Sequence, residues 1–312
     1  MTQRVFVTGA TGFVGSAVID ELLSRNIAVN ALARRAEVRP GNASVTTIPG
    51  DLFDAAALDR GVRDCDAVIH LVGIINENPK AGSTFQHIHV EGTQRVVEAT
   101  QRAGIKRYVH MSALGTRPGA TSFYHRTKFA AEEFVRASPL DWTIFRPSLI
   151  HGPAGEFMAM EAMWARKKAP PPIFFMPFMP YFGAGFLGRG GAGMLQPVYV
   201  KDVARAFVDS LDNPKTIKET YPLGGSEQLT WPALHQAIAQ AVVGHRRWVM
   251  PIPVWKAKLL AKFGLGKLLG FNRDQVIMSQ EDNTCDLAKF ERDFGWKPAP
   301  FRAELLKYAG ER

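Results

Sequence analysis

The chain has 312 residues, of which 46% are hydrophobic and 21% are charged. This length fits one large α/β domain or one domain with a smaller lobe, and the composition excludes a largely disordered chain. Lys and Arg outnumber Asp and Glu by 38 − 29 = 9. This excess of positive charge predicts attraction to anions such as phosphorylated cofactors, nucleic acid or an acidic membrane surface.

Cysteine content and the first residues point to the compartment. Cys65 and Cys285 are the only cysteines, too few and too far apart for a disulfide framework or a cysteine-based zinc site. We therefore expect no metal and a reducing compartment. Residues 4–8 resemble a strand rather than the apolar core of an export signal, and the prolines within residues 169–188 would break a membrane-spanning helix. These features predict a cytoplasmic protein.

Short β-branched runs alternate with segments of helical periodicity through the first half of the chain, which predicts a parallel sheet covered on both faces. We predict strands over Val5–Thr8, Ala28–Ala33, Val45–Ile48, Ala67–Leu71, Arg107–Met111 and Trp142–Phe145. Between them we predict helices over Val14–Ser24, Leu58–Val62, Phe85–Ala103 and Tyr124–Ala137. This order is typical of a Rossmann-type, doubly wound α/β fold.

The character of the sequence changes after Pro147. Pro and Gly cluster through residues 152–197. Helical segments are predicted over Val203–Leu211, Trp231–Val243, Val254–Leu269, Asp274–Met278 and Leu287–Phe294. We predict a dinucleotide-binding domain over residues 1–150 and a smaller mixed C-terminal substrate or docking lobe over residues 151–312, interleaved with the last elements of the first domain.

A glycine-rich turn follows the first predicted strand and opens the first helix. Glycines without a Cβ let the backbone turn tightly and approach a pyrophosphate, while the amide groups and dipole of the helix face the anion. A plain strand-to-helix turn is the alternative, but the position directly after an N-terminal strand favours a dinucleotide. The expected contacts come from Gly9, Thr11, Gly12, Phe13, Val14 and Gly15.

Arg34 and Arg35 stand at the end of the second predicted strand, where an acidic residue would bind the ribose 2′-hydroxyl of NAD. A guanidinium there can bind a 2′-phosphate instead, so we expect NADP(H) to be preferred over NAD(H). The alternative is that one or both arginines are solvated loop residues. Along the same sheet edge, we expect Asp51 and Leu52 at the adenine, and Leu71, Val72 and Gly73 beneath the cofactor.

Tyr124 and Lys128 are four residues apart in a predicted helix, so both side chains can face one cleft. A nearby cation favours the phenolate, which brings a tyrosine closer to use as a general acid or base. Tyr124 and Lys128 are also expected among the cofactor contacts, with Lys128 at the hydroxyls of the nicotinamide ribose. The same spacing also arises by chance on exposed helices.

Together these features resemble the extended and atypical branches of the short-chain dehydrogenase/reductase superfamily, of the epimerase/dehydratase type. The shared parts are the glycine turn, Ser112 at a strand end, the pair Tyr124 and Lys128, and Arg146-Pro147 after the sixth strand. Residues 196–204 match a late segment of extended members. The resemblance covers nearly the full length of the chain.

The resemblance also implies roles for individual residues. Pro147, Ser148 and Leu149 would lie against the nicotinamide, and Ser112, Tyr124 and Lys128 would form a catalytic site. Ser122 is an alternative to Ser112 as the hydroxyl that polarises a substrate oxygen, because it lies two residues before Tyr124. His151 follows the nicotinamide segment, where a packed histidine is more common than a proton relay.

Residues 72–77, 85–93, 272–276 and 281–283 are similar to the branch that contains the dehydrogenase-like accessory subunit of respiratory complex I and its bacterial relatives. This similarity implies an NADPH-binding protein with a structural or redox-sensing role. The alternative is an active NADP(H)-dependent oxidoreductase, or a nucleotide-sugar epimerase or dehydratase, that uses Tyr124 as general acid and base.

Two basic and apolar stretches lie outside the predicted cofactor domain. Residues 162–201 carry five Lys or Arg and no acid, and residues 245–273 carry seven and no acid, with Trp255, Leu259 and Phe263 repeating every four residues. A basic amphipathic helix can bind an anionic membrane, here at its inner face, or a respiratory complex. The alternative is a helix that caps the lobe with a solvated basic face. We expect no nucleic acid partner, since no recognised module is present.

Overall fold

Seven parallel strands form one sheet, in the order β11, β6, β5, β4, β1, β2 and β3. They belong to the first of two units of the chain, which comprises Met1–Pro147, Val200–Leu223 and Asp286–Lys297. The computed structural model describes all residues except 169–177, 184–192, 256, 258, 260–272 and 310–312. The strand order reverses between β1 and β4, which is the point where doubly wound sheets bind their ligands.

The strands are short, and most of their side chains are buried from both faces of the sheet, as expected of parallel strands. They are β1 (Arg4–Thr8), β2 (Ala28–Ala33), β3 (Val45–Pro49), β4 (Ala67–His70), β5 (Arg107–Met111), β6 (Asp141–Pro147) and β11 (Glu219–Leu223). The fold class and the first six strands are confirmed. The sequence did not predict β11, which pairs with β6 at the edge of the sheet.

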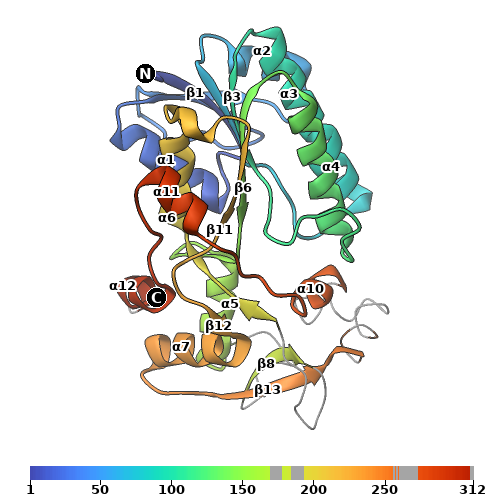
Figure 1. The fold of residues 1–312 in the computed structure, drawn as a ribbon, viewed down its shortest axis with the longest axis vertical. Helices are drawn as coiled ribbons and strands as arrows, with labels where there is room; N and C mark the ends of the chain where they lie inside the picture. The colour runs from blue at the N-terminus through green and yellow to red at the C-terminus, as the bar shows by residue number, and fades with distance from the viewer. Residues whose placement is uncertain (169–177, 184–192, 256, 258, 260–272, 310–312) are drawn as a thin grey trace. The chain divides into compact units, whose positions relative to one another are not determined.

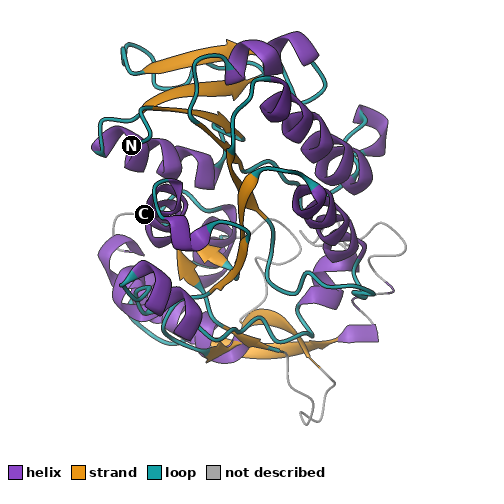
Figure 2. Cartoon of the chain, turned by 45° about the horizontal axis from the view of Figure 1, so that its top comes forward, coloured by secondary structure: helices purple, strands orange, loops and turns teal. Residues whose placement is uncertain are grey.

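Helices cover both faces of this sheet (Figure 1). On one face lie α1 (Phe13–Ser24), α6 (Val200–Leu211) and α11 (Ala288–Phe294), and on the other lie α2 (Ala55–Val62), α3 (Gly92–Arg102) and α4 (Phe123–Ala137). A π-helical turn over Gln86–Glu91 leads into α3. Figure 2 shows the strands of the sheet between the helices. The core beneath α2, α3 and α4 includes Phe6, Leu58, Val96, Tyr108 and Val135.

The second unit comprises Ser148–Tyr199, Gly224–Cys285 and Pro298–Arg312. Its strands form three pairs: β7 (Ile150–His151) with β10 (Val198–Tyr199), β9 (Met194–Leu195) with β12 (Leu229–Thr230), and β8 (Phe178–Gly183) with β13 (Trp248–Pro253). Its helices include α5 (Glu156–Ala165), α7 (Trp231–Val243), α10 (Arg273–Met278) and α12 (Phe301–Tyr308). Met158, Leu234, Ile238, Phe301 and Leu305 form its core.

Two sequence predictions fall largely outside the described residues. Of residues 169–188, the structure describes 178–183, which form β8. Of the helix predicted over 254–269, it describes residues 254, 255, 257 and 259, all helical. Among the helices that the structure describes, none has the length and apolar character needed to span a bilayer.

Candidate functional site

The turn between β1 and α1 disfavours side chains at two of its glycines, through the backbone conformation of Gly9 and the lack of space at Gly15. Gly9 has a φ of +77°, and a Cβ there would lie 3.2 Å from the carbonyl carbon of Leu71. A Cβ on Gly15 would lie 2.1 Å from the carbonyl oxygen of Gly9. α1 therefore starts directly against the turn, with Gly12 at its N-cap and no side chain bonded to its first amides. Such amides have no partner within a helix, so this cradle fits a dinucleotide pyrophosphate.

The remaining turn residues differ in exposure. Thr11 and Gly12 are exposed and Phe13 is half-buried, whereas Val14 and Gly15 are buried. The Val14 side chain packs into the protein interior, so only its backbone amide is suited to binding an anion. Of the predicted contacts, the exposed residues can therefore meet a cofactor directly, whereas the buried residues can do so only through their backbone.

A buried histidine holds the end of β1 next to this turn. Nδ1 of His70 lies 2.6 Å from Oγ1 of Thr8, and its Nε2 lies 3.1 Å from Oγ1 of Thr93. Burial lowers the pKa of His70 to about 3, so the imidazole is neutral. This contact ties β1, β4 and α3 together behind the glycine turn.

The arginines after β2 take different positions. Arg34 and Arg35 are exposed, and neither has a hydrogen-bond or ion-pair partner among the described residues. Arg39, which the sequence analysis did not single out, is bound to α1: its Nη2 donates to Oγ of Ser16 at 2.7 Å and to Asp20 at 2.7 Å. Because Asp20 neutralises Arg39, the cations free to meet a phosphate in this loop are Arg34 and Arg35.

Asp51 and Leu52 follow β3. Oδ1 of Asp51 accepts hydrogen bonds from the amides of Phe53 at 2.8 Å and Asp54 at 3.2 Å, so this oxygen stabilises the local turn. Leu52 is buried in the core, where its side chain would meet a Cβ on Gly92 at 2.7 Å. Its side chain is therefore a packing group, and only its backbone is suited to meeting a cofactor.

After β4 the backbone passes close to Lys128. Leu71 is buried, Val72 half-buried and Gly73 exposed. A Cβ on Gly73 would lie 2.9 Å from Nζ of Lys128, so a side chain at this position would displace the ammonium group. Nζ of Lys128 donates a hydrogen bond to the carbonyl of Met111 at 3.1 Å, at the end of β5.

His89 joins this segment to α4. Its Nε2 lies 3.1 Å from the backbone nitrogen and oxygen of Ile74, and its Nδ1 lies 2.9 Å from Oγ1 of Thr127. Burial, together with the charge of Lys128, lowers the pKa of His89 to about 2. The neutral imidazole therefore fixes the distance between the loop after β4 and the helix that carries Tyr124 and Lys128.

The structure corrects the expected effect of Lys128 on Tyr124. Burial raises the pKa of Tyr124 to about 12, where the sequence analysis expected a neighbouring cation to favour the phenolate. Burial also lowers the pKa of Lys128 to about 8, against the charge of Glu132, which raises it. Desolvation therefore dominates the pKa of both groups. Tyr124 is accordingly a phenol at neutral pH, the form that can donate a proton.

The structure separates the two candidate hydroxyls. Ser122 is fully buried and caps α4, because its Oγ accepts a hydrogen bond from the amide of His125 at 3.1 Å. Ser112 is also buried, directly after β5, and its Oγ lies 3.4 Å from Oγ1 of Thr116, a long and weak contact. Ser112 therefore has the hydroxyl with greater freedom to bind another oxygen.

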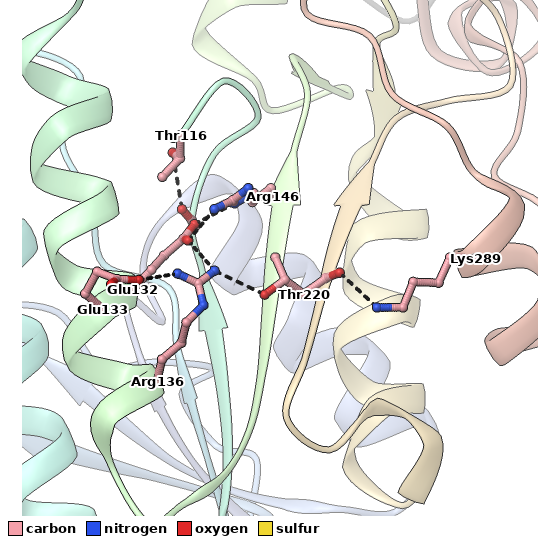
Figure 3. A network of polar contacts seen from close by, with 8 residues as sticks. Thr116, Glu132, Glu133, Arg136, Arg146, Thr220 and Lys289 are labelled. Carbon is pink, nitrogen blue, oxygen red and sulfur yellow. Dashed lines mark hydrogen bonds and ion pairs between the residues drawn. The ribbon is translucent and has the colours of Figure 1, made fainter. Parts of the chain in front are cut away.

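One turn after Lys128 on α4, a buried carboxylate binds two arginines (Figure 3). Glu132 is fully buried and accepts hydrogen bonds from Arg146 at 2.6 and 2.8 Å and from Arg136 at 2.7 Å. Arg136 also donates to Oγ1 of Thr220 at 3.2 Å on β11. Arg146 is the arginine that precedes Pro147, so this network fixes the end of β6 against α4.

The predicted nicotinamide segment crosses the boundary of the two units. Pro147 closes β6 in the first unit, where its carbonyl accepts a hydrogen bond from the amide of Leu114 at 2.8 Å. In the second unit, Oδ1 of Asn283 accepts hydrogen bonds from Oγ of Ser148 at 2.6 Å and from the amide of Leu149 at 3.1 Å. Asn283 thus fixes the start of this unit.

His151 is a packed histidine. It is fully buried, its Nδ1 lies 2.9 Å from the Tyr308 hydroxyl, and its ring meets that of Phe301 edge-on at 4.8 Å. Burial lowers its pKa to about 3. These contacts belong to the core of the second unit and favour the packing role over a proton relay.

His89, Arg39 and Asn283 were not predicted individually from the sequence. Two of them lie in stretches already noted, residues 85–93 and 281–283, but their partners are distant in sequence: Thr127 for His89 and Ser148 for Asn283. A histidine on the buried side of a helical segment was the only available signal for His89. Arg39 carried none, because a loop arginine is ordinarily solvated.

Comparisons with known proteins show which families the chain resembles. A family model described as NAD(P)H-binding matches residues 9–162. Subunit 9 of the alpha subcomplex of mitochondrial NADH dehydrogenase (ubiquinone) from Arabidopsis thaliana is 30% identical over 290 residues, or 86% of this chain and 68% of that protein. A ceramide reductase from Caulobacter vibrioides is 34% identical over 151 residues, or 48% of this chain and 47% of that protein.

Solved structures share the fold. A UDP-glucose 4-epimerase from Thermotoga maritima, solved with UDP-glucose, aligns with a TM-score of 0.73 at 19% identity, covering 99% of this chain and 98% of that chain. At this identity the similarity concerns the fold alone. Together with the family model, the cradle of the glycine turn establishes an NAD(P)-binding domain.

Proposed function

Because the chain belongs to the extended short-chain dehydrogenase/reductase superfamily and to the family of NADH dehydrogenase alpha-subcomplex subunit 9, we propose that it is an NADP(H)-binding accessory protein of a respiratory complex. In this role it holds the dinucleotide with little or no turnover and has a structural or redox-sensing function. The observation that carries the preference for NADP(H) is the pair Arg34 and Arg35, exposed and without polar partners among the described residues.

In this proposal different residues of the chain bind different parts of the dinucleotide. The amides of Phe13 and Val14 bind the pyrophosphate, because the amide of Gly12 already donates to the carbonyl of Gly9 at 3.0 Å. Arg34 or Arg35 binds the 2′-phosphate. Leu71, Val72 and Gly73 lie beneath the cofactor, and Asp51 and the backbone of Leu52 lie at the adenine. Lys128 binds the nicotinamide ribose.

Arg34→Asp tests the cofactor preference. We expect the affinity for NADPH to fall by about 5- to 150-fold, equivalent to the ~1–3 kcal/mol of a lost charge-assisted hydrogen bond. The affinity for NADH should change little, because NADH lacks the 2′-phosphate. Titration calorimetry with both nucleotides measures the difference, and Arg35→Asp shows how the two arginines share it. Equal affinities of the unmodified protein for NADH and NADPH would refute the preference.

The second candidate function is an NADP(H)-dependent oxidoreductase. Two observations favour it: Tyr124 is a protonated phenol four residues before the buried Lys128 on α4, and 48% of the chain is similar to a ceramide reductase. A bound nicotinamide would supply the hydride. Tyr124 would then donate its proton to the carbonyl oxygen of the substrate, Ser112 would hydrogen-bond the same oxygen, and Lys128 would hold the ribose. An apolar or quinone-like carbonyl compound suits the Phe- and Met-rich sequence after residue 170.

Tyr124→Phe tests this candidate. If the protein turns over, the phenylalanine variant should lose about 100-fold or more of the rate, in the range of one general acid, and its NADPH affinity should stay unchanged. The assay follows NADPH absorbance with quinones, aldehydes and nucleotide sugars. Oxidation that disappears in Tyr124→Phe would displace the accessory role. No oxidation with any substrate, together with co-sedimentation with the respiratory complex, would support it.

The proposed location is the cytoplasmic face of a membrane, where a respiratory complex is anchored. The similarity to the subunit 9 family supports a partner of this kind. The roles of residues 162–201 and 245–273 as docking segments belong to this proposal. Fractionation of cells that produce the tagged protein checks the location: we expect it with the membranes at low salt.

A further inference from the structure

One surface of the second unit combines exposed apolar side chains with cations. Trp248 is 85% exposed and Met250 is 40% exposed, and both lie on β13. Since side chains alternate along a strand, these two point to the same side. Further along the chain, Trp255 is 64% exposed and Leu259 is 49% exposed. Large apolar side chains that are exposed on one stretch of the chain are suited to contact with a partner or a membrane.

A hydrogen bond links the two segments that carry these cations. Nε of Arg247 donates a hydrogen bond to the carbonyl of Ala165 at 2.9 Å, which attaches the start of β13 to the C-terminal end of α5. Lys167 and Lys168 follow α5 directly and are exposed, and Arg246 is exposed next to Trp248. We call Lys167, Lys168, Arg246, Trp248 and Met250 the basic-aromatic face.

The basic-aromatic face is presented by ordered elements. β13 pairs in parallel with β8 along its whole length, and both strands lie against α7. Trp248 is therefore fixed on a strand, and so is its neighbour Met250. A fixed position lowers the entropy that the side chain would lose on binding.

The two stretches of sequence that carry these cations are free of acidic residues. Residues 162–168 and 244–259 contain no Asp or Glu. We propose that the basic-aromatic face binds the surface of a membrane that contains acidic phospholipids. Tryptophan favours the interface between headgroups and acyl chains. Each Lys or Arg near an acidic leaflet adds binding free energy, because the surface potential of that leaflet is negative.

The composition of the face favours lipid over nucleic acid. Met250 offers neither a ring that stacks on a base nor a hydrogen-bonding group, but its side chain gains by entering the acyl-chain boundary. An acidic protein surface would attract the cations of the face, but it would not provide an apolar environment for Trp248. This inference deepens the membrane location in the proposed function and rests on that proposal, while the dinucleotide site remains a separate property of the first unit.

The test is sedimentation of the full chain with vesicles. We expect binding to phosphatidylcholine vesicles that contain phosphatidylglycerol, weak binding to phosphatidylcholine alone, and release at high salt. Arg246→Gln or Lys168→Gln should each lower the partition coefficient about fivefold, the contribution of one cation. Trp248→Ser should lower it about tenfold, the contribution of one partly inserted apolar side chain.

Matched variants control for charge and for apolar surface. Arg63→Gln removes an exposed cation in the first unit, and Leu306→Ser removes a side chain that is 70% exposed on α12. Both should bind vesicles as the unmodified protein does. Every variant changes an exposed side chain, and circular dichroism with a melting curve confirms that it folds. NADPH titration of the same samples reads the dinucleotide site independently.

Several outcomes would overturn the inference. They are equal binding to the two kinds of vesicle, no binding to either, and binding that survives the combined Arg246→Gln and Trp248→Ser changes. If RNA displaces the protein from vesicles, the face binds nucleic acid. If vesicles do not bind and the protein instead forms a stoichiometric complex with another protein, which Trp248→Ser abolishes, the face is a protein interface. Loss of NADPH binding with intact vesicle binding would refute the proposed function of the first unit and leave this face in place.

Discussion

Gly15→Ala is expected to lower the dinucleotide affinity by about 100-fold. The added methyl group overpacks the binding turn itself, and overpacking of this kind destabilises a structure by up to ~3 kcal/mol. The new Cβ would lie 2.1 Å from the carbonyl oxygen of Gly9 and 2.9 Å from Cα of Ala10, both backbone atoms. α1 must then move away from the turn, which withdraws the amides that face the pyrophosphate. Calorimetric titration with NADPH measures the loss.

Gly61→Ala is the matched control for this prediction. Its Cβ would lie 2.3 Å from the buried Phe6 ring, on α2 and away from the turn. We expect a comparable loss of stability, about 1–3 kcal/mol, with the NADPH affinity kept within about twofold because the two sites do not share contacts. Equal losses of affinity in both variants would mean that general destabilisation, and not the shape of the turn, controls binding.

Glu132→Ala is expected to lower the free energy of unfolding by about 3 kcal/mol, since removal of one partner from a buried ion pair leaves the other charges uncompensated. Arg136 and Arg146 both approach the fully buried carboxylate, at 2.7 and 2.6 Å. Each arginine keeps some access to water, which places the expected loss at the lower end of the range. Urea denaturation followed by circular dichroism gives the value.

Glu133→Ala provides the comparison on the adjacent residue. The Glu133 side chain is 56% exposed and pairs with the same Arg136 at 2.8 Å. An exposed pair of this kind contributes about 0.5 kcal/mol or less. Similar losses for the two variants would contradict the role assigned to burial. Glu132→Gln, which keeps the shape and removes the charge, should fall between them.

The sheet could be predicted where its strands are apolar on both faces. β1, β2 and β4 are short runs with few polar residues, and such runs between helical segments are typical of parallel strands. β11 escaped prediction because Glu219–Leu223 mixes polar residues with Pro222. A proline is tolerated there because the strand pairs only with β6 at the sheet edge, a fact of the tertiary structure.

Two helices of the second unit were also missed, for different reasons. α5 has apolar residues on nearly every side, so it shows no helical periodicity, and it lies within a Pro- and Gly-rich stretch. α12 carries its buried residues at 301, 304, 305 and 308, a helical spacing that the sequence does show over a short segment. Helical periodicity is thus absent from the sequence of α5, and in α12 it extends over only a short segment.

By itself, the sequence determined the doubly wound parallel sheet, the glycine turn and the placement of Tyr124 and Lys128 on one helix. These features depend on periodicity and spacing within single elements. The tertiary structure alone decided that Ser122 is a helix cap and that burial raises the pKa of Tyr124. It also decided that Arg39 is paired while Arg34 and Arg35 have no polar partner among the described residues. The physical reason is that desolvation and pairing depend on neighbours brought together from distant parts of the chain.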